Sequence, residues 1–304
     1  MPLAIFGGGR IRTNTPAENA YNALQAANQQ IALRQLRLST GKRINSPADD
    51  VAGYITSRAL LSRVGSLRSA LNAVGDAKNV TAIAMDGLDN ISSLVTKIKE
   101  AASSAASGAL GTDEKVSLAQ AAYRLAEQIQ TVVNSTVFGG QELLANTFSG
   151  DFVIGFRADN SLITIGIDLT TANSFAVNLN VQGNPNFAGV TGLDLTSLNA
   201  VSASDLGVFS STQIATTLAS LASALDNITN FAAYIGGITN RLESQEAALQ
   251  TQITNYNAAI SRIEDADVAL EQLELIKAQF LQQSSVISLA QANQFPQVFL
   301  QLLV

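Results

Sequence analysis

One group of residues near the C-terminal end has the side chains for chemistry: Arg262, Asp265 and Asp267 lie within six positions. Carboxylates this close together can ligate a divalent cation or act as general acid and base. However, Asp267 falls on the apolar seam of a predicted helix and Arg262 is next to another seam position. We therefore predict that these side chains pair between helices and do not catalyse a reaction.

A second charged group lies near the N-terminal end, where Arg43 and Asn45 precede Asp49 and Asp50. An ion pair between Arg43 and the two carboxylates could fix the junction between two helical regions. The alternative is a solvated turn, because Asn-Ser-Pro at 45–47 is ordinary N-cap chemistry. We favour the structural cluster, and we predict a junction cluster made of the residues Arg43, Asn45, Asp49, Asp50, Arg262, Asp265 and Asp267.

The amino-acid composition excludes most other catalytic and metal-binding chemistry. The 304 residues include no Cys, His or Trp, which removes thiolates and imidazoles from catalysis and metal binding. The three glycines at 7–9 lack the Lys-Ser/Thr and the preceding strand of a phosphate loop. We predict no enzymatic activity, no catalytic residue, no metal and no cofactor. The 18 basic and 24 acidic residues give a net charge of −6, which argues against nucleic acid as a partner.

The elements that position these groups are predicted to be long helices. Apolar residues make up 47% of the chain but aromatic residues only 6%, a balance that suits close helix packing. In the C-terminal half the spacing alternates between four and three, which predicts one narrow seam on a helix of roughly 85 Å. The seam residues are Ile214, Leu218, Leu221, Leu225, Ile228, Ala232, Ile235, Thr239, Leu242, Glu246, Leu249, Ile253, Tyr256, Ile260, Ile263, Asp267 and Leu270.

The N-terminal half carries matching seams. One runs from Leu67 to Ala105, a shorter one from Leu118 to Val132, and residues 107–114 break the helix between them. Near the start, Leu24, Ala27, Ile31 and Leu38 keep the spacing, with Arg34 as the one interruption. The predicted fold is mainly α: a long antiparallel coiled coil or helical bundle formed by the N- and C-terminal halves, with a small central β-hairpin region.

The middle of the chain, from about 138 to 209, loses helical periodicity. Alternating β-formers predict strands around 152–156, 162–169 and 175–181, with a hairpin turn at 159–161. No stretch reaches the ~18 uncharged apolar residues of a membrane span, and the opening residues lack the basic region and apolar length of a signal peptide.

The C-terminal segment has no charged side chain after Lys277, and seven of its last ten residues are large and apolar. A surface helix normally keeps a charged face, so this segment is predicted to be buried on most sides by other chains. The residues predicted to pack between subunits are Leu24, Ile31, Leu38, Leu289, Ala292, Phe295, Phe299, Leu300 and Leu303.

Four motifs resemble those of bacterial flagellin. LRLSTGKRINSPADDVAG at 36–53 is similar to its N-terminal signature RLSSGxRINSAxDDAAG, and NSTVFGGQELL at 134–144 to its NxTxFNGxxLL. SRIEDAD at 261–267 and LAQANQFPQVFL at 289–300 resemble its SRIxDAD and LAQANQxPQxxL. The resemblance covers both helical halves and leaves out only the middle.

The resemblance implies a subunit that self-polymerises into the flagellar filament for motility. It implies helices of an inner core at 1–46 and 261–304, helices of an outer core at 47–138 and 210–260, and a β-rich insert at 139–209. It also implies an extracellular location, export without a cleaved signal peptide, an export chaperone on the C-terminal segment, and contact with the export apparatus and with junction and cap proteins. Membrane insertion is not expected.

Two alternatives remain open. A hook-filament junction protein has similar helical ends, although the LAQANQFPQ run favours the filament subunit. Some flagellins carry an inserted protease with an HExxH motif, but this chain contains no His. The sequence departs from the family in about ten extra N-terminal residues, in a short middle insert, and in lacking the RVREL patch around 88–94.

Overall fold

A computed structural model describes residues 14–157, 161–170, 177–202 and 205–301 of the chain. The chain divides into two compact units. The first unit contains residues 1–64 and 254–304, and the second contains residues 65–253.

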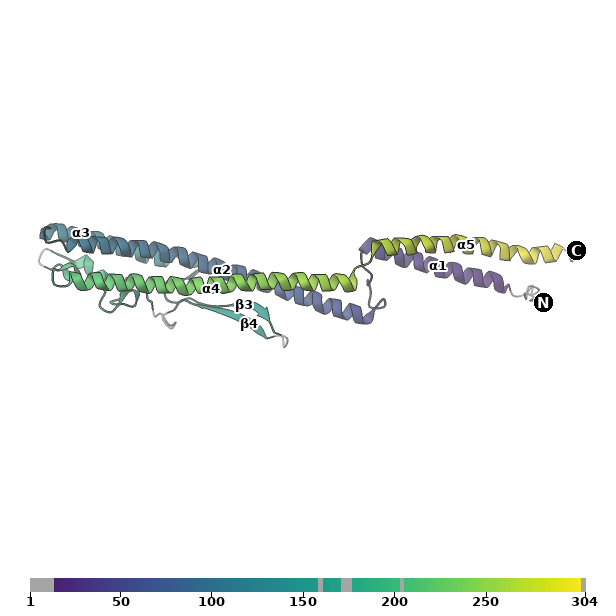
Figure 1. Ribbon diagram of the computed structural model, residues 1–304, viewed down its shortest axis with the longest axis horizontal. Coiled ribbons are helices and arrows are strands. Elements are labelled where there is room, and N and C mark those ends of the chain that lie inside the picture. Colours follow the sequence, from purple (N-terminus) through teal and green to yellow (C-terminus); the bar gives the residue numbers. More distant parts are fainter. Residues whose placement is uncertain (1–13, 158–160, 171–176, 203–204, 302–304) are drawn as a thin grey trace. The chain divides into compact units, whose positions relative to one another are not determined.

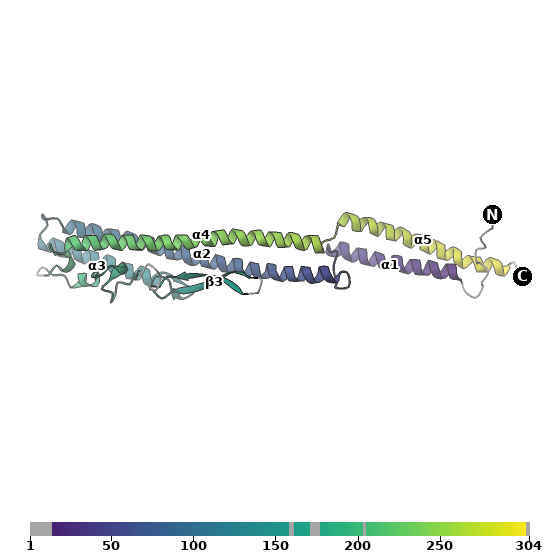
Figure 2. The same cartoon turned by 60° about the horizontal axis from the view of Figure 1, so that its bottom comes forward.

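The first unit is built on an antiparallel pair of helices, α1 (Thr15–Thr40) and α5 (Val268–Gln301). They lie side by side in both ribbon views (Figures 1 and 2). The side chain of Asn28 accepts a hydrogen bond from Gln282 at 2.7 Å, and Nδ2 of Asn14 donates to the carbonyl of Ala292 at 2.8 Å. Position numbers fall on one helix as they rise on the other, which confirms the predicted antiparallel pairing.

The second unit contains most of α2 (Val51–Ala105), all of α3 (Thr112–Ser135) and most of α4 (Ile214–Glu264). The helical break predicted at 107–114 separates α2 from α3. On α2 the predicted seam is confirmed at every position, because each seam side chain is buried. These residues are Leu67, Ala70, Val74, Ala77, Thr81, Ala84, Leu88, Ile91, Val95, Ile98, Ala102 and Ala105.

On α3 and α4 the predicted seam is half right. Ile214, Leu221, Ile228, Ile235, Leu242 and Leu249 are buried on α4, but the positions between them are only half-buried, and the positions one residue earlier are buried instead: Thr217, Ala224, Phe231 and Ile238. On α3 the shift runs in the other direction: Leu118, Leu125 and Val132 are only half-buried, and the residues one position later are buried instead, namely Ala119, Ala126 and Val133. A helix covered on two sides buries a wider stripe than a coiled-coil seam.

The second covering is the central segment. Nε2 of Gln245 on α4 donates to the carbonyl of Ile154 at 3.0 Å, and Nδ2 of Asn227 donates to that of Ala188 at 2.9 Å. On α3, the side chain of Gln130 accepts from the amide of Val181 at 2.8 Å. A prediction of buried positions from seam spacing cannot include these contacts, because they come from a part of the chain without helical periodicity.

The predicted continuation of the α4 seam into Asp267 and Leu270 is wrong. Helix α4 ends at Glu264 and α5 begins at Val268, so the long helix is interrupted. Both Asp267 and Leu270 are exposed. Oδ1 of Asp267 accepts hydrogen bonds from the amides of Ala269 at 2.9 Å and Leu270 at 3.2 Å, which is how a helix N-cap works.

The central region holds two small antiparallel pairs. Strands β1 (Val137–Phe138) and β2 (Gln141–Glu142) meet across Gly139 and Gly140, whose positive φ values of 59° and 82° suit a tight hairpin turn. Strands β3 (Ser149–Phe156) and β4 (Leu162–Asp168) form the predicted hairpin, paired from Ser149↔Asp168 to Phe156↔Leu162. Positions 159 and 160 of the predicted turn lie outside the described residues.

The third predicted strand is wrong within the described part of it. Residues 177–181 have no strand partner, and Phe175 lies outside the described residues. Val177, Leu179 and Val181 are buried nevertheless. Hydrogen bonds attach this stretch to Gln130 of α3 and to Ala145 and Ala188 of the central segment, so its alternation does not come from a sheet. Short 3-10 helices follow: η1 (Phe187–Gly189), η2 (Thr196–Ala200) and η3 (Gly207–Phe209).

Candidate assembly surface and junction cluster

The junction cluster forms where two connections of the first unit run past each other. Gly41 caps the C-terminal end of α1 in the left-handed conformation, with φ of 69°, and the chain then continues toward α2. The amide of Arg43 donates to the carbonyl of Glu264 at 2.7 Å, and the amide of Ala266 donates to that of Gly41 at 2.9 Å. The connection between α1 and α2 is therefore bonded directly to the connection between α4 and α5.

The turn at 45–49 is organised by one carboxylate. Oδ2 of Asp49 accepts from the amides of Ser46 at 2.8 Å and Asn45 at 3.0 Å, and Nδ2 of Asn45 donates to the carbonyl of Lys42 at 3.0 Å. The backbone hydrogen bonds from Ser46 and Asn45 lower the pKa of Asp49 below its ordinary value. Asp49 therefore holds a turn.

Asp50 begins α2. Its Oδ1 accepts from the amide of Gly53 at 2.9 Å, as an N-cap does, and its Oδ2 lies 4.0 Å from the guanidinium of Arg43. A Cβ on Gly53 would lie 2.7 Å from Cδ1 of the buried Ile44 and 2.5 Å from Oδ2 of Asp50. This close approach explains why a glycine stands there.

The remaining predicted cluster residues lie on the other connection. Ser261 donates a hydrogen bond to Oδ2 of Asp265, and Asp265 pairs with Lys42 through the backbone. The guanidinium of Arg43 donates to the carbonyl of Ile263 at 2.8 Å, whereas the side chain of Arg262 next to it is exposed. The structure thus brings Arg43, Asn45, Asp49, Asp50 and the backbone of Asp265 together, and places Asp267 at the cap of α5.

Sequence reasoning missed two buried carboxylates beside this cluster. Glu264 is buried and lies 3.2 Å from Nζ of Lys42. Glu271 on α5 lies between two cations of α1, with Oε2 at 2.8 Å from Arg34 and Oε1 at 3.2 Å from Arg37. The signal for Glu271 was present, because Arg34 interrupts an apolar seam and a cation at such a position needs a buried partner.

The predicted packing residues of the two terminal helices fall into three groups. Leu24, Ile31, Leu38 and Leu289 are half-buried, and Ala292 is buried. Phe295, Phe299 and Leu300 belong to α5, but the structure does not describe their side chains. Leu303 lies outside the described residues. The described members thus line the contact between α1 and α5 within one chain.

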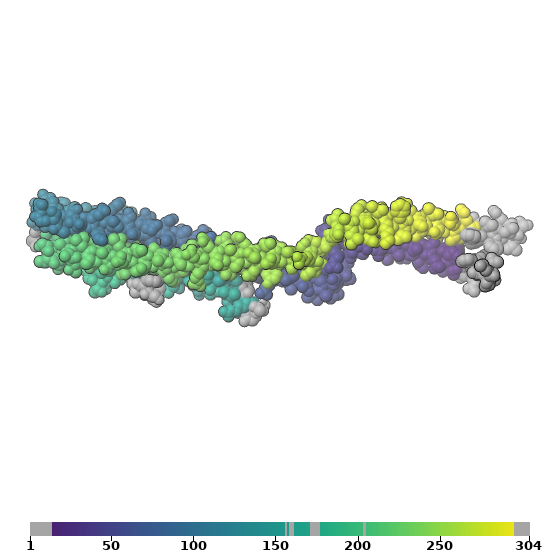
Figure 3. Space-filling model, viewed as in Figure 1, coloured from purple at the N-terminus to yellow at the C-terminus, as the bar shows by residue number. Residues whose placement is uncertain are grey.

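The opposite side of α5 carries the larger apolar side chains. Phe280 is 69% exposed and Ile287 60% exposed. We define the outward α5 surface as the exposed residues Val268, Leu270, Leu273, Ile276, Phe280, Leu281, Val286 and Ile287. Figure 3 shows α5 (yellow) lying along α1 (purple).

A shallow groove of about 350 Å³ runs between α1 and α5. Its walls combine Ala23, Ala26 and Ala27 of α1 with Ala278 and Leu281 of α5. Its remaining lining residues are the polar Gln30, Glu274, Lys277 and Ser285. Among the described residues, this helix pair thus presents a mixed groove and, on α5, a surface of large exposed apolar side chains, and Leu281 belongs to both.

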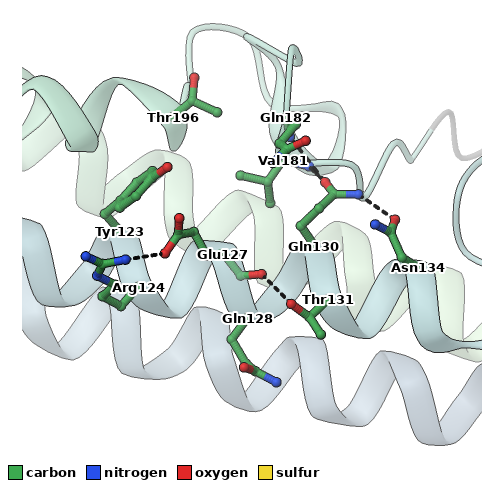
Figure 4. Close-up of a pocket in the computed structure, with 10 residues that line it drawn as sticks. All are labelled: Tyr123, Arg124, Glu127, Gln128, Gln130, Thr131, Asn134, Val181, Gln182 and Thr196. Atoms are coloured by element: carbon green, nitrogen blue, oxygen red, sulfur yellow. Dashed lines mark hydrogen bonds and ion pairs between the residues drawn. The ribbon is translucent and has the colours of Figure 1, made fainter.

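A hollow of about 590 Å³ in the second unit lies between α3 and the central segment (Figure 4). Gln130 crosses its floor and bonds to Val181, Gln182 and Asn134. Burial and the nearby Glu127 raise the pKa of Tyr123 at its edge. Among the polar side chains named here, Gln130 attaches the central segment to α3.

Neither a metal site nor a membrane helix is found in the part of the chain that the structure describes. No group of three or more His, Cys, Asp or Glu side chains there could hold a metal ion. Similarly, none of the described helices is both long and apolar enough to cross a membrane.

Comparison with known proteins identifies the family. The family described as bacterial flagellin N-terminal helical region matches residues 11–149, and bacterial flagellin C-terminal helical region matches residues 218–303. Flagellin of Bacillus subtilis is 30% identical over 97% of this chain and 99% of its own length. Flagellin FlaB1 of Treponema pallidum is 27% identical over 96% and 99%.

A solved structure shares the fold. A flagellar hook-associated protein of Vibrio parahaemolyticus superposes with a TM-score of 0.57 at 14% identity, covering 71% of this chain and 100% of that one. At this identity the likeness concerns the fold alone, so it does not favour the hook-filament junction alternative. The flagellin relatives extend over nearly the full length, and the chain therefore belongs to the bacterial flagellin family, as a structural subunit of the flagellar filament.

Proposed function

We propose that this flagellin polymerises by packing the outward α5 surface against the α1–α5 pair of other copies. The observation that carries the proposal is that α5 exposes eight large apolar residues, whereas its buried described residues are small or polar apart from Leu275. Fully burying one large apolar side chain is worth about 1.5–3 kcal/mol. Contiguous exposed apolar surface of this kind marks an interaction site.

The polymer geometry follows from the two different surfaces. A ridge on one side of the helix pair and a groove on another make a heterologous contact, in which each copy offers one surface and receives the other. Such contacts extend without closing when the rotation does not bring the chain of subunits back on itself. We assign residues 1–46 and 261–304 to the inner core of the filament and the helices at 47–138 and 210–260 to the outer core, with 139–209 as the insert.

The predicted packing role of Phe295, Phe299, Leu300 and Leu303 is part of the proposal. These residues lie in the segment without charges after Lys277. The same chemistry makes this segment a client for a helix-binding groove, so we propose that an export chaperone covers it before assembly. We also propose contacts with the export apparatus and with junction and cap proteins, and family membership supports this.

The junction cluster, in this proposal, sets the connection between inner and outer core and has no catalytic role. Its carboxylates cap helices and hold a turn, as described for Asp49, Asp50 and Asp267. We propose that the protein has no enzymatic activity.

The test replaces large apolar residues of the outward α5 surface by serine. In the triple variant Leu273→Ser, Phe280→Ser, Ile287→Ser, we expect filaments to be lost, because three apolar side chains no longer leave water on assembly. Sedimentation and electron microscopy of seeded protein measure this, and circular dichroism shows whether the chain remains helical.

The matched control is Gln279→Ser with Gln283→Ser, at exposed polar positions on the same helix. This variant should assemble as the parent does. Normal filaments from the triple variant would contradict the proposed surface. Deletion of 295–304 tests the tail separately: it should abolish filaments while the helices of the second unit stay folded.

A further inference from the structure

The triad Arg34–Glu271–Arg37 brings charged side chains into the described α1–α5 contact, which otherwise combines apolar packing with two hydrogen bonds between uncharged groups, Asn28 with Gln282 and Asn14 with Ala292. The side chain of Glu271 is only 6% exposed, and those of Arg34 and Arg37 are 20% and 17% exposed. Both cations come from α1 and the carboxylate comes from α5. One carboxylate is thus held by two residues a helical turn apart on the facing helix.

Stability is a poor explanation for this triad. Taking charges out of water costs free energy that their attraction often fails to recover, and an apolar replacement of similar size is frequently as stable. Here the cost is higher still, because Nε of Arg37 is buried without a hydrogen-bond partner. A layer of leucines would avoid that cost.

The packing residues between α1 and α5 recur at regular intervals along both helices. On α1, Leu24, Ile31 and Leu38 are seven residues apart, and on α5 the small buried residues Ala278, Ser285 and Ala292 also recur every seven. Sliding one helix by seven residues, about 10 Å, places similar side chains opposite one another. The apolar contacts therefore discriminate weakly between the native register and a slipped one.

We propose that the triad determines the register of α1 against α5. In one slipped register Glu271 would lie beside Ala27 and Gln30, neither of which carries a charge. In the other it would lie near Gly41, beyond the end of α1. Either slip leaves a carboxylate and two guanidinium groups without their partners, so the native register is selected by the penalty on its alternatives.

A competing device lies close by. The backbone hydrogen bonds of Arg43 to Glu264 and of Ala266 to Gly41 tie the two connections together just beyond the helix ends. If they alone fixed the register, the triad would be dispensable. The experiment must separate these two causes.

The chain has no cysteine, so introduced pairs report the register without background. Asn28→Cys with Gln282→Cys reports the native register, because these side chains are hydrogen-bonded. Tyr21→Cys with Gln282→Cys and Gln35→Cys with Gln282→Cys report slips of seven residues in the two directions. Each pair is placed in the full-length protein, oxidised under assembly conditions, and scored by mass spectrometry as intramolecular disulfide at the monomer mass.

With the triad intact, the native pair should form disulfide at least about tenfold more than either slipped pair. In the apolar variant Arg34→Leu, Arg37→Leu, Glu271→Leu, helical content should persist while slipped and native pairs form disulfide in comparable yield. Exclusive native disulfide in this helical variant would overturn the proposal and assign the register to the backbone connections.

A charge-swapped variant keeps the test decisive if the apolar one loses its helices. Arg34→Glu, Arg37→Glu and Glu271→Arg restore opposite charges at the same positions, and native-only disulfide is the expected result. Slipped disulfides in the charge-swapped protein would contradict the proposal. If the register depended only on filling the interior of the helix pair, restoring opposite charges would not restore the native register.

Discussion

The α2 stripe of the second unit and the α1–α5 pair of the first use the same seven-residue spacing in opposite ways. On α2, Leu88, Ile91, Val95 and Ile98 are each at most 1% exposed. On α5 the buried positions include Ala278, Ser285 and Ala292, whereas Phe280 and other large residues face outward. Along its seam α2 encloses large apolar side chains, whereas α5 exposes most of its own and buries only Leu275 among the described ones.

The difference shows which unit is completed by its own chain. The second unit covers α3 and α4 with the central segment, so its apolar residues have intramolecular partners on two sides. The α1–α5 pair has no such covering among the described residues. In the assembly proposed above, the exposed apolar side chains of α5 leave water only when another copy packs on them, so stability and assembly should respond to different mutations.

The largest expected effect comes from an isoleucine compared between the two helices. Ile91→Ala removes a fully buried side chain and should lower the free energy of unfolding of the second unit by about 2–5 kcal/mol. Ile287→Ala, at a position 60% exposed, should change it by less than about 0.5 kcal/mol yet weaken assembly. Denaturant titration of the monomer and sedimentation of filaments measure the two effects. Equal losses of stability in the Ile91→Ala and Ile287→Ala variants would contradict the proposed difference between the two helices.

Two glycines of α2 sharpen the account of the second unit. A Cβ at Gly87 would lie 2.7 Å from Cδ1 of Leu144 and 2.9 Å from Oγ1 of Thr136, so Gly87→Ala should destabilise by about 1–3 kcal/mol. At Gly75 nothing lies within 4 Å, and Gly75→Ala should stabilise by up to about 1 kcal/mol. Melting temperatures that move in the same direction for both variants would show that the contact of Gly87 with Thr136 and Leu144 does not limit this site.

Acid should loosen the first unit more than the second. Burial alone would raise the pKa of Glu271, but the hydrogen bonds and charges of Arg34 and Arg37 outweigh it and lower this pKa. The stabilisation is therefore present above the ordinary carboxyl range and is lost as pH falls through the pKa of the folded state. Amide exchange in α1 and α5 should accelerate on acidification, and Glu271→Gln should reduce that pH dependence. An unchanged pH profile in this variant would contradict the assignment.

The smallest expected effect is the loss of a helix cap. Asp267→Ala removes the acceptor for the amides of Ala269 and Leu270 and should cost about 1 kcal/mol in the first unit. Asp267→Asn retains an acceptor and should cost less. Hydrogen exchange in the first turn of α5 is the measurement, and a larger loss in the second unit would show that the cap acts beyond its own helix.

Much of the helical core could be predicted, because a helix that packs against one neighbour buries residues at a fixed period. The α2 seam was predicted at each position for this reason. On α3 and α4 the prediction failed at alternate positions, since Gln130, Asn227 and Gln245 bond to a segment whose path the helical period does not describe. The chain from 177 to 181 alternates like a strand, but its neighbours are helices.

The junction cluster was predicted in part. The residue types for capping and pairing are visible in 43–50 and 261–267, as is the interruption of a seam by Arg34. Which partner each charge takes depends on where two separate connections cross. Arg43 accordingly donates to the carbonyl of Ile263 as well as lying 4.0 Å from Asp50, and the partner of Arg34 lies 237 positions away.

The sequence by itself determined the long helices, the β-hairpin between β3 and β4, the uncharged C-terminal segment and the resemblance to flagellin, since these rest on local spacing and composition. Only the tertiary structure decided that α4 and α5 are separate helices, that Glu271 lies between Arg34 and Arg37, and that α5 turns its large residues outward. A heptad pattern gives the period of a buried stripe, but which side of a helix is covered depends on neighbours distant in the chain.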